Sequence, residues 1–485
     1  MGPLDASIVN VGLPFMASAL GMTLLRAEWV ITAYFLVITV LLLVWGRLGD
    51  MVGHRSVYLG GFAIFALGSL ACGLAPSGGM LIGARVVQAL GAGMMMAVGP
   101  ALVARAFPPG RRGQALGLIG MVVAAALAVG PPLGGFLVER WGWRSLFLVN
   151  LPVAALGIAW GRRVLPRAPG IWGARSYSAG DRTSGGARDI WSRFDWAGAV
   201  LLGGGLLAWL LFLSEGQKWG WSSPPALSLG LGGAVGILFF LLRQRRVEEP
   251  MLDLGLFRSR TFSGATSAAL LNFMGQSAVL FLLPFYLREV RGLEGQEIGL
   301  LLLPAPLAVL VVAPLAGTLA DRVGARPLSF AGQGLIALNL FLLSRLAAGA
   351  STWQLAFLLG SIGVGGGLFQ PSNNTAIMNS VPFERLGTAS GMLATMRNLG
   401  MSVGVAVAAA ILEARRRFWL GALGPEAGKA GSRVAEAAQH QAFAAAFTEA
   451  LAVAGVFAVL GTLVTLIRGP EAVPGGLPRR GSRAE

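Results

Sequence analysis

Residues 46–55 read GRLGDMVGHR, and residues 317–326 read GTLADRVGAR. The two decapeptides share glycine, leucine, aspartate, valine, glycine and arginine at matching positions. A shorter pair, GQALG at 113–117 and GTASG at 387–391, follows in the same order and at nearly the same separation. Two such echoes indicate an internal repeat in which the second half of the chain copies the first.

The composition around this repeat is that of a membrane protein. Of the 485 residues, 55% are hydrophobic and 12% are charged, and the mean hydropathy is +0.69. Soluble domains carry about a quarter charged residues, so a water-soluble enzyme is excluded. The 71 glycines fit the same class, because glycine is more frequent in membrane helices than in soluble ones. The single cysteine, Cys72, excludes an intrachain disulfide and a cysteine-cluster metal site.

Apolar runs long enough to cross a bilayer recur along the whole chain. A helix needs about 20 apolar residues to span the hydrocarbon core. We expect fourteen spans, at about 3–20, 29–49, 56–75, 79–101, 114–138, 145–162, 195–213, 225–243, 261–286, 297–317, 327–347, 353–378, 388–412 and 441–467. The connections at 163–194 and 413–440 are longer than the others, and we expect both to be solvated loops.

The repeat divides the expected helices into six, an inserted pair and six, because the first decapeptide follows helix 2 and its copy follows helix 10. We therefore predict an all-α membrane protein with two six-helix repeats. The predicted parts are a six-helix bundle at 1–162, a loop with the inserted helices 7 and 8 at 163–260, a second six-helix bundle at 261–467 and a disordered tail at 468–485. Parallel six-helix repeats are an architecture of secondary transporters, whose substrate site lies between the halves.

The net charge of +16 is explained largely by topology. Most of the 38 lysines and arginines lie in loops that follow even-numbered helices or in the C-terminal tail. Because short cytoplasmic loops are rich in these residues, we expect those loops and both termini to be cytoplasmic, in a protein of the cytoplasmic membrane. No soluble face gathers the charge, which argues against a nucleic-acid partner.

Ionisable side chains inside the spans are functional candidates, because a charge within the membrane is costly. Asp5 lies in the first apolar run, where loss of solvent disfavours the charged carboxylate, so it is a candidate for taking up and releasing a proton. Arg85 lies inside helix 4 and stays protonated, which makes it a candidate partner for that carboxyl. The alternatives are that Asp5 caps a helix at the interface and that Arg85 reaches the membrane surface.

Two groups of residues are candidates for moving parts. In helix 5, small residues and proline combine at Gly130, Pro131, Gly134 and Gly135, which suits a gate or, alternatively, a fixed kink. In the repeated loops, an acid lies among basic residues and glycines, which predicts a cytoplasmic latch that breaks on opening. Its expected members are Gly46, Asp50, Gly53, Arg55, Asp321 and Arg326.

Polar side chains within the spans predict a substrate cavity, because unpaired amides are costly in hydrocarbon. The expected lining residues are Asn10, Asn272, Gln276, Gln370, Asn373, Asn374 and Arg397. Hydrogen bonding between helices is the alternative for these residues, and Arg397 could equally pair with substrate or with backbone carbonyls. After Glu297 at its first position, helix 10 carries no acid within its span, which argues against a dedicated second carboxylate for a dication.

These motifs together resemble the major facilitator superfamily, in particular its fourteen-helix drug:proton antiporter branch. Residues 46–55 look like the superfamily's loop 2–3 signature, and residues 4–14 (LDASIVNVGLP) look like the helix 1 motif of the branch. Residues 85–91 are similar to the helix 4 motif associated with proton transfer, and residues 130–135 resemble the antiporter motif of exporters. The segments 143–152 and 215–221 also look like this branch.

The chain departs from the family pattern at two places. Ala126 stands where the antiporter motif normally has glycine. Only four residues precede Asp5, where the family has a further half-helix, so we expect a true start about ten residues upstream by the helix length that a span requires.

The resemblance implies a proton-coupled exporter of amphipathic small molecules that works by alternating access. Its expected partners are that substrate, protons and the lipid bilayer, with no cofactor and no metal, since the proton gradient supplies the energy. The alternatives are a dedicated exporter of one self-made metabolite, antibiotic or siderophore, a pump that needs a periplasmic adaptor, and a non-transporting membrane sensor. No serine, histidine or metal constellation in the sequence supports an enzyme.

Overall fold

The computed structural model describes residues 1–22, 24–108, 111–165, 194–247, 250–293, 295–346, 350–422 and 433–468. Regular secondary structure in these ranges is entirely helical, which confirms the all-α prediction. Thirteen of the helical segments are long and apolar enough to cross a membrane. The fourteenth expected span, α1 (Gly2–Ala19), is helical but is not among those thirteen. Most of the loop predicted at 163–194 and nearly all of the predicted tail lie outside the described residues.

The helices follow the predicted order. The first half contains α1, α2 (Leu24–Val52), α3 (His54–Gly73), α4 (Gly78–Ala106), α5 (Arg112–Trp141) and a span made of α6 (Ser145–Leu148) and α7 (Asn150–Val164). The inserted pair is α10 (Trp196–Trp219) and α11 (Pro224–Gln244), followed by the short helix η2 (Leu254–Arg258). The second half contains α12 (Arg260–Glu289), a span made of α13 (Gly295–Leu302) and α14 (Pro304–Val323), α15 (Ala325–Leu346), α16 (Thr352–Asn379), η3 (Phe383–Arg385), α17 (Leu386–Ala422) and α18 (Arg433–Ile467).

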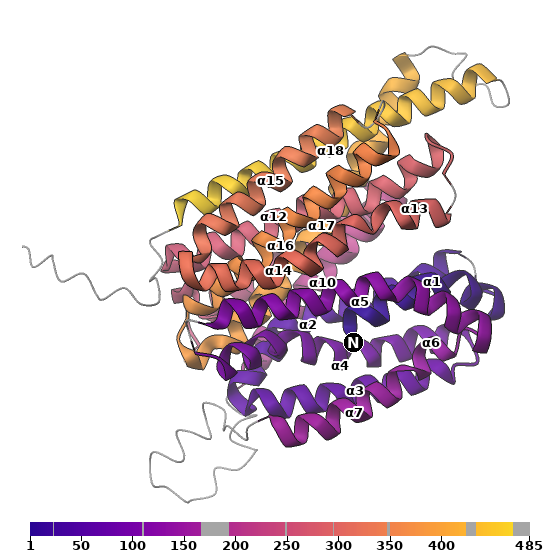
Figure 1. Ribbon diagram of the computed structural model, residues 1–485. Helices are drawn as coiled ribbons and strands as arrows, with labels where there is room; N and C mark the ends of the chain where they lie inside the picture. The colour runs from indigo at the N-terminus through magenta and orange to yellow at the C-terminus, as the bar shows by residue number, and fades with distance from the viewer. Residues whose placement is uncertain are drawn as a thin grey trace, which may run out of the picture.

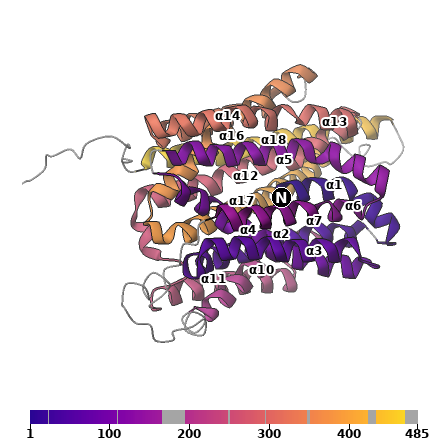
Figure 2. The same ribbon diagram turned by 60° about the horizontal axis from the view of Figure 1, so that its bottom comes forward.

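The two halves form adjacent bundles, with α1–α7 on one side and α12–α18 on the other (Figure 1). They meet at two principal helix pairs, α5 against α14 and α2 against α17. The inserted helices α10 and α11 pack on each other, and α10 also contacts both α2 and α17. In Figure 2 the pair lies along the edge of the molecule beside α2. The inserted pair therefore packs beside one of the two junctions between the halves.

The internal repeat extends to the backbone. Gly53 separates α2 from α3 with a φ of 104°, and Gly324 separates α14 from α15 with a φ of 91°. Positive φ is readily adopted by glycine and disfavoured for residues with a Cβ. The matching glycines of the two decapeptides therefore make the same sharp turn between two helices.

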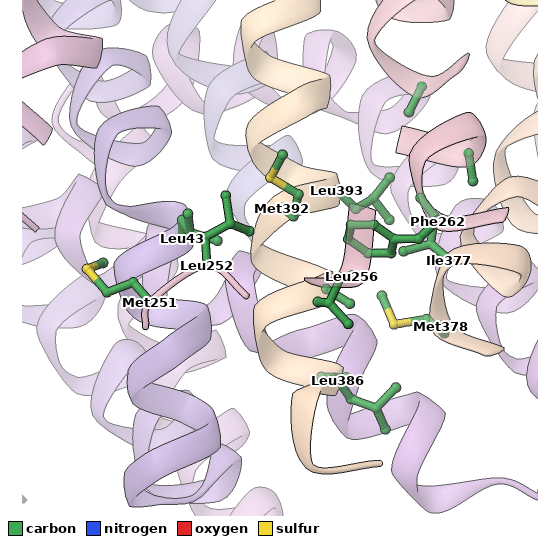
Figure 3. Close-up of a cluster of buried hydrophobic side chains, with 14 of the residues drawn as sticks. Leu43, Met251, Leu252, Leu256, Phe262, Ile377, Met378, Leu386, Met392 and Leu393 are labelled. Carbon is green, nitrogen blue, oxygen red and sulfur yellow. The ribbon is translucent and has the colours of Figure 1, made fainter. Parts of the chain in front are cut away.

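A hydrophobic cluster joins the two halves and the segment that follows the inserted pair (Figure 3). Leu43 comes from α2, Leu393 from α17, Phe262 from α12, and Met251 and Leu252 from the segment before η2. Since lipid is as apolar as these side chains, close packing rather than removal from water stabilises such a contact within a membrane.

The structure corrects the predicted loop at 413–440. Helix α17 continues to Ala422 and α18 begins at Arg433, so much of this segment is helical. Arg415 of this segment forms a bidentate ion pair with Glu449 of α18, whose Oε1 also accepts a hydrogen bond from Trp419 Nε1 at 3.1 Å. The prediction was wrong here because charged side chains are compatible with a helix when oppositely charged partners lie close to them.

A buried carboxylate holds the inserted pair together at one end. Asp195 caps α10 by accepting a hydrogen bond from the Gly198 amide at 2.8 Å. It also accepts from Arg243 Nε at 2.7 Å and from Gln244 Nε2 at 2.8 Å, both on α11. Gln244 Oε1 in turn accepts from the Leu252 amide at 3.1 Å. One carboxylate thus links α10, α11 and the segment that leads to α12.

We predict that Asp195→Ala lowers the free energy of unfolding by about 2–3 kcal/mol, because it leaves a buried amide side chain and a helix-terminal N–H without acceptors. The measurement is an SDS unfolding titration of the purified protein in mixed micelles. Glu413→Ala is the matched control, since the ion pair of Glu413 with Arg417 is exposed and such pairs contribute about 0–1 kcal/mol. Equal losses in the two variants would contradict the prediction.

Candidate functional site

The two ionisable residues predicted for the interior form an ion pair. Arg85 Nη1 of α4 lies 2.7 Å from Asp5 Oδ2 of α1, and both side chains are completely buried. The two residues are 80 positions apart in the chain. The structure therefore brings together the pair that the sequence singled out, and it places Asp5 in the interior.

Polar side chains from other helices complete the shell around the carboxylate. Asp5 Oδ1 accepts hydrogen bonds from Asn150 Nδ2 at 2.7 Å and from Gln88 Nε2 at 3.0 Å. Gln88 Nε2 also lies 2.8 Å from Ser69 Oγ, and Gln88 Oε1 accepts from Arg85 Nη1 at 2.6 Å. Since a buried carboxylate is stable only when its lone pairs are satisfied, this shell supplies hydrogen-bond partners to both carboxylate oxygens of Asp5.

The guanidinium of Arg85 is held independently of Asp5. Its Nε donates to the Val30 carbonyl oxygen at 3.0 Å, and its Cζ lies 4.0 Å from the centre of the Tyr34 ring. The Phe147 ring is 5.8 Å away on α6. A cation over an aromatic face is stabilised by the ring quadrupole, by about 2 kcal/mol when both are desolvated. Arg85 therefore keeps partners even when Asp5 is neutral.

Helix α1, which carries Asp5, packs closely on α5 through two of the predicted gating glycines. A Cβ at Gly130 would lie 2.4 Å from Ser7 Oγ, and one at Gly134 would lie 3.2 Å from the Ile8 carbonyl oxygen. Gly135 faces open space, and the side chain of Pro131 is outside the described residues. Helix α5 is continuous from Arg112 to Trp141. The small residues of this motif thus serve the α1–α5 contact.

The first predicted latch aspartate binds the opposite half. Asp50, at the end of α2, accepts hydrogen bonds from the backbone N–H groups of Gly387 and Thr388 at 2.8 and 2.7 Å, and from Thr388 Oγ1 at 2.7 Å. These groups lie in the first turn of α17, where unpaired N–H groups and the helix dipole attract an anion. A Cβ at Gly46 would lie 2.5 Å from the Gly387 carbonyl oxygen, so glycine allows this close approach.

A histidine connects this contact to α4. His54 Nε2 lies 3.3 Å from Asp50 Oδ1, and His54 Nδ1 lies 2.8 Å from Arg105 Nη1. Because a guanidinium only donates hydrogen bonds, Nδ1 must accept, and the proton of neutral His54 is therefore on Nε2, facing Asp50. Arg105 also lies 4.3 Å from the centre of the Phe383 ring in η3 of the opposite half.

The second latch aspartate repeats the arrangement with the halves exchanged. Asp321, at the end of α14, accepts hydrogen bonds from the N–H groups of Gly113 and Gln114 in the first turn of α5, both at 2.9 Å. A Cβ at Gly317 would lie 2.1 Å from the Gly113 carbonyl oxygen. We call the end of the molecule where both contacts form the latch end. Each half thus presents an aspartate to a helix N-terminus of the other.

The latch differs from the prediction in what the acids bind. Arg55 Nη2 donates to the Arg162 carbonyl oxygen of α7 at 2.7 Å, and Arg326 donates to the Leu466 carbonyl oxygen of α18. Both arginines therefore fasten helices within their own half. The aspartates bind peptide N–H groups across the halves, because a helix N-terminus supplies several aligned donors at once.

The predicted cavity residues divide into two groups. Gln276 Nε2 donates to Asn272 Oδ1 at 3.2 Å, and a Cβ at Gly366 would lie 3.4 Å from Gln276 Nε2 and 4.0 Å from Gln370 Nε2. These three amides are therefore gathered between α12 and α16. Asn373 instead bonds the Ala265 carbonyl oxygen at 3.0 Å and accepts from Arg468, which is helix-to-helix bonding. Asn374 and Arg397 are partly buried, and the side chain of Asn10 lies outside the described residues.

Several residues of the ion-pair shell were missed from the sequence. Gln88 is one turn from Arg85 within the helix 4 motif, and Asn150 lies inside the segment 143–152, so both had a sequence signal in their motif context. Tyr34 and Ser69 had none, because an isolated tyrosine or serine in an apolar run is equally compatible with packing.

Comparison with known proteins gives the chain a family and a fold. The profile of the Major Facilitator Superfamily matches residues 1–405. The riboflavin transporter RibZ of Clostridioides difficile is 32% identical over 84% of both chains. The multidrug resistance protein Stp of Mycobacterium tuberculosis is 35% identical over 86% of this chain and 74% of its own length. The tetracenomycin C resistance and export protein of Streptomyces glaucescens is 31% identical, with the same shares covered.

Solved structures agree with this fold. The human organic anion transporter MFSD10 superposes with a TM-score of 0.62 at 16% identity, covering 96% of this chain and 97% of that one. The proton:xylose symporter XylE superposes with a TM-score of 0.60 at 13% identity, covering 95% and 92%. At such identity these likenesses concern the fold alone.

We predict that Arg85→Gln and Asp5→Asn are coupled in their effect on stability. Arg85→Gln alone leaves a buried carboxylate without its cation and should lower the free energy of unfolding by about 3–5 kcal/mol. The double variant Asp5→Asn/Arg85→Gln should recover at least about 1 kcal/mol of that loss, because no unpaired charge remains. SDS unfolding titrations of the four proteins give the coupling energy. If the losses in free energy of unfolding of the two single variants added up to that of the double variant, Asp5 and Arg85 would not be energetically coupled.

The latch predicts a conformational shift. Asp321→Ala removes two charge-assisted hydrogen bonds between the halves, each contributing about 1.5–3 kcal/mol, so the population open at the latch end should rise more than tenfold. The measurement is a double electron–electron resonance distance between spin labels at exposed positions 52 and 323, in a Cys72→Ser background that removes the single native cysteine.

Asp253→Ala is the matched control for this experiment. Asp253 also accepts a backbone N–H bond, from Gly255 at 2.8 Å, but within its own loop. An unchanged distance distribution in Asp321→Ala, or an equal change in Asp253→Ala, would show that the aspartate does not hold the halves closed.

Proposed function

Because this chain belongs to the Major Facilitator Superfamily, in the branch that includes multidrug and antibiotic resistance exporters, we propose that it exports amphipathic small molecules across the cytoplasmic membrane in exchange for protons. It would do so by alternating access, with the latch end and both termini on the cytoplasmic side. The observation that carries the proposal is the completely buried ion pair of Asp5 with Arg85.

Proton uptake at Asp5 would change the bonding of α1 to its neighbours. The charged carboxylate accepts hydrogen bonds from three side chains, those of Arg85, Gln88 and Asn150. A protonated carboxyl loses the charge that attracts Arg85, while Arg85 keeps Val30 and Tyr34 as partners. Protonation would therefore weaken the hold of α4 on α1 and leave the cation in place.

Two helices connect this event to the latch. Helix α5 packs against α1 at Gly130 and Gly134 and supplies, from its first turn, the N–H groups that bind Asp321. Helix α4 carries Arg85 near one end and Arg105, which bonds His54, near the other. A displacement of α1 relative to α4 and α5 would thus be felt at both aspartate contacts, which is how proton binding could open the latch end.

A dedicated transporter of a single compound is the second candidate. It is favoured by relatives whose names specify one compound, riboflavin in one case and tetracenomycin C in another. The two functions share the coupling mechanism and differ in breadth of cargo. A panel of structurally unrelated probes separates them, because a dedicated transporter carries or binds only one chemical type.

We predict that Asp5→Asn abolishes coupling to the proton gradient and spares cargo exchange. Purified protein in proteoliposomes would be tested with three fluorescent probes: Hoechst 33342, riboflavin and 1-pyrenebutyrate. For each transported probe, gradient-driven movement should fall at least about tenfold in the variant, as expected when a group essential to one step is lost. Exchange of labelled for unlabelled probe without a gradient should persist, because it needs no proton release.

Glu413→Gln serves as the control, since Glu413 is an exposed acid on α17 that pairs with Arg417 of the same helix. Transport by the unmodified protein that ignores a proton-gradient uncoupler, together with an Asp5→Asn variant of full activity, would refute proton coupling at this site.

A further inference from the structure

Arg397 is another cation within the membrane-spanning part of the chain, and its surroundings differ from those of Arg85. It lies eleven residues into α17, about 16 Å from the start of that helix at 1.5 Å per residue, which is about half the thickness of a bilayer core. Its side chain is partly buried. Within the described part of the chain, it forms no hydrogen bond, ion pair or ring contact.

On α17, Arg397 follows residues that contact the first half. A Cβ at Gly391 would lie 2.8 Å from the Leu42 carbonyl oxygen of α2, and Ala394 belongs to the same buried cluster as Tyr34 and Ile38. One turn beyond Arg397, a Cβ at Gly400 would lie 3.0 Å from Phe273 Cβ of α12. Arg397 therefore lies on α17 between residues that contact the first half and a residue that contacts α12.

The acids of the interior are engaged elsewhere. Asp5 binds Arg85 and two amides, Asp50 binds the first turn of α17, and Asp321 binds the first turn of α5. Glu449 is bound to Arg415 near the far end of α17. None of the described carboxylates lies within ion-pair distance of Arg397. Its charge therefore has no counter-charge from the described side chains.

Two amide groups of α12 and α17 also have donors that lack an acceptor. The Nδ2 atoms of Asn398, adjacent on α17, and of Asn272, on α12, are buried without an acceptor. An arginine adds five N–H donors and no acceptor, and it stays protonated. Retaining a charge and unpaired donors inside a membrane protein is costly, so the missing acceptor is best supplied by a bound molecule.

We propose that Arg397 binds the carboxylate of the transported compound, and hence that the cargo is an amphipathic acid with an apolar body and one anionic group. This rests on the proposed export function. The carboxylate would accept two parallel hydrogen bonds from the planar guanidinium, and the apolar body would pack against side chains such as Phe273. The site is separate from the proton-binding pair, because Asp5 and Arg85 already satisfy each other.

The test compares two probes with the same apolar body, 1-pyrenebutyrate and 1-pyrenebutanol, at pH 7. Binding to the full chain in lipid nanodiscs is followed by fluorescence, and signal from empty nanodiscs is subtracted. The unmodified protein should bind the acid at least about tenfold more tightly than the alcohol, by the strength of charge-assisted hydrogen bonds. Arg397→Gln should reduce acid binding to the level of the alcohol and leave alcohol binding unchanged.

Two variants complete the design. Arg397→Lys keeps the charge and should retain part of the preference for the acid, which provides a reading if Arg397→Gln does not fold. Arg417→Gln, an exposed arginine on the same helix, should change neither affinity. Equal binding of acid and alcohol by the unmodified protein, or an equal loss of both probes in Arg397→Gln, would overturn the proposal. Because binding is measured without a gradient, failure of proton coupling would leave this result readable.

Discussion

The cost of an unpaired charge in a low-dielectric interior is the constraint on which the rest of this structure depends. Asp5 and Arg85 are both completely buried, and each is stable there because the other is present and because neighbouring groups supply further hydrogen bonds. The same constraint makes the pair sensitive to protonation, since adding one proton removes the charge that all of its partners are arranged to stabilise.

The helices that carry the ion pair, and the helix packed against them, also take part in the contacts between the two halves. Asp5 is carried by α1, Arg85 by α4, and the helix that α1 packs against is α5. Helix α5 begins at one cross-half contact, and the C-terminal end of α4 lies beside the other. The α5 connection runs through the helix itself, whereas the α4 connection also passes through the side chains of Arg105 and His54. Both favour whole-helix movement, which is how packed interfaces change between discrete states.

Much of this arrangement could be predicted from the sequence, and the failures have physical reasons. Charges in apolar runs are conspicuous, so Asp5 and Arg85 were found together, and the repeated decapeptide identified Asp50 and Asp321. The partners of these two aspartates were predicted to be arginines. In the structure the partners across the halves are mainly backbone N–H groups, and because every residue except proline has one, no sequence pattern identifies them. The loop at 413–440 was wrong for a related reason: the ion pair that keeps α17 and α18 helical joins residues distant in the chain. The sequence therefore indicates which charged side chains are buried, whereas their partners depend on the tertiary fold.

Arg85 and Arg397 also bear on the energetics of the proposed export. An inward proton moves one positive charge down a membrane potential that is negative inside, and an outward carboxylate moves one negative charge in the favourable direction as well. Each elementary charge contributes about 2.3 kcal/mol per 100 mV, so exchange of one proton for an acid would draw on twice the electrical energy available for a neutral cargo. A paired Arg85 that tunes the proton site, together with an Arg397 that is left to the cargo, would suit this exchange. Two separate cations would thus allow the proton and the cargo to be bound at different places and still respond to the same potential.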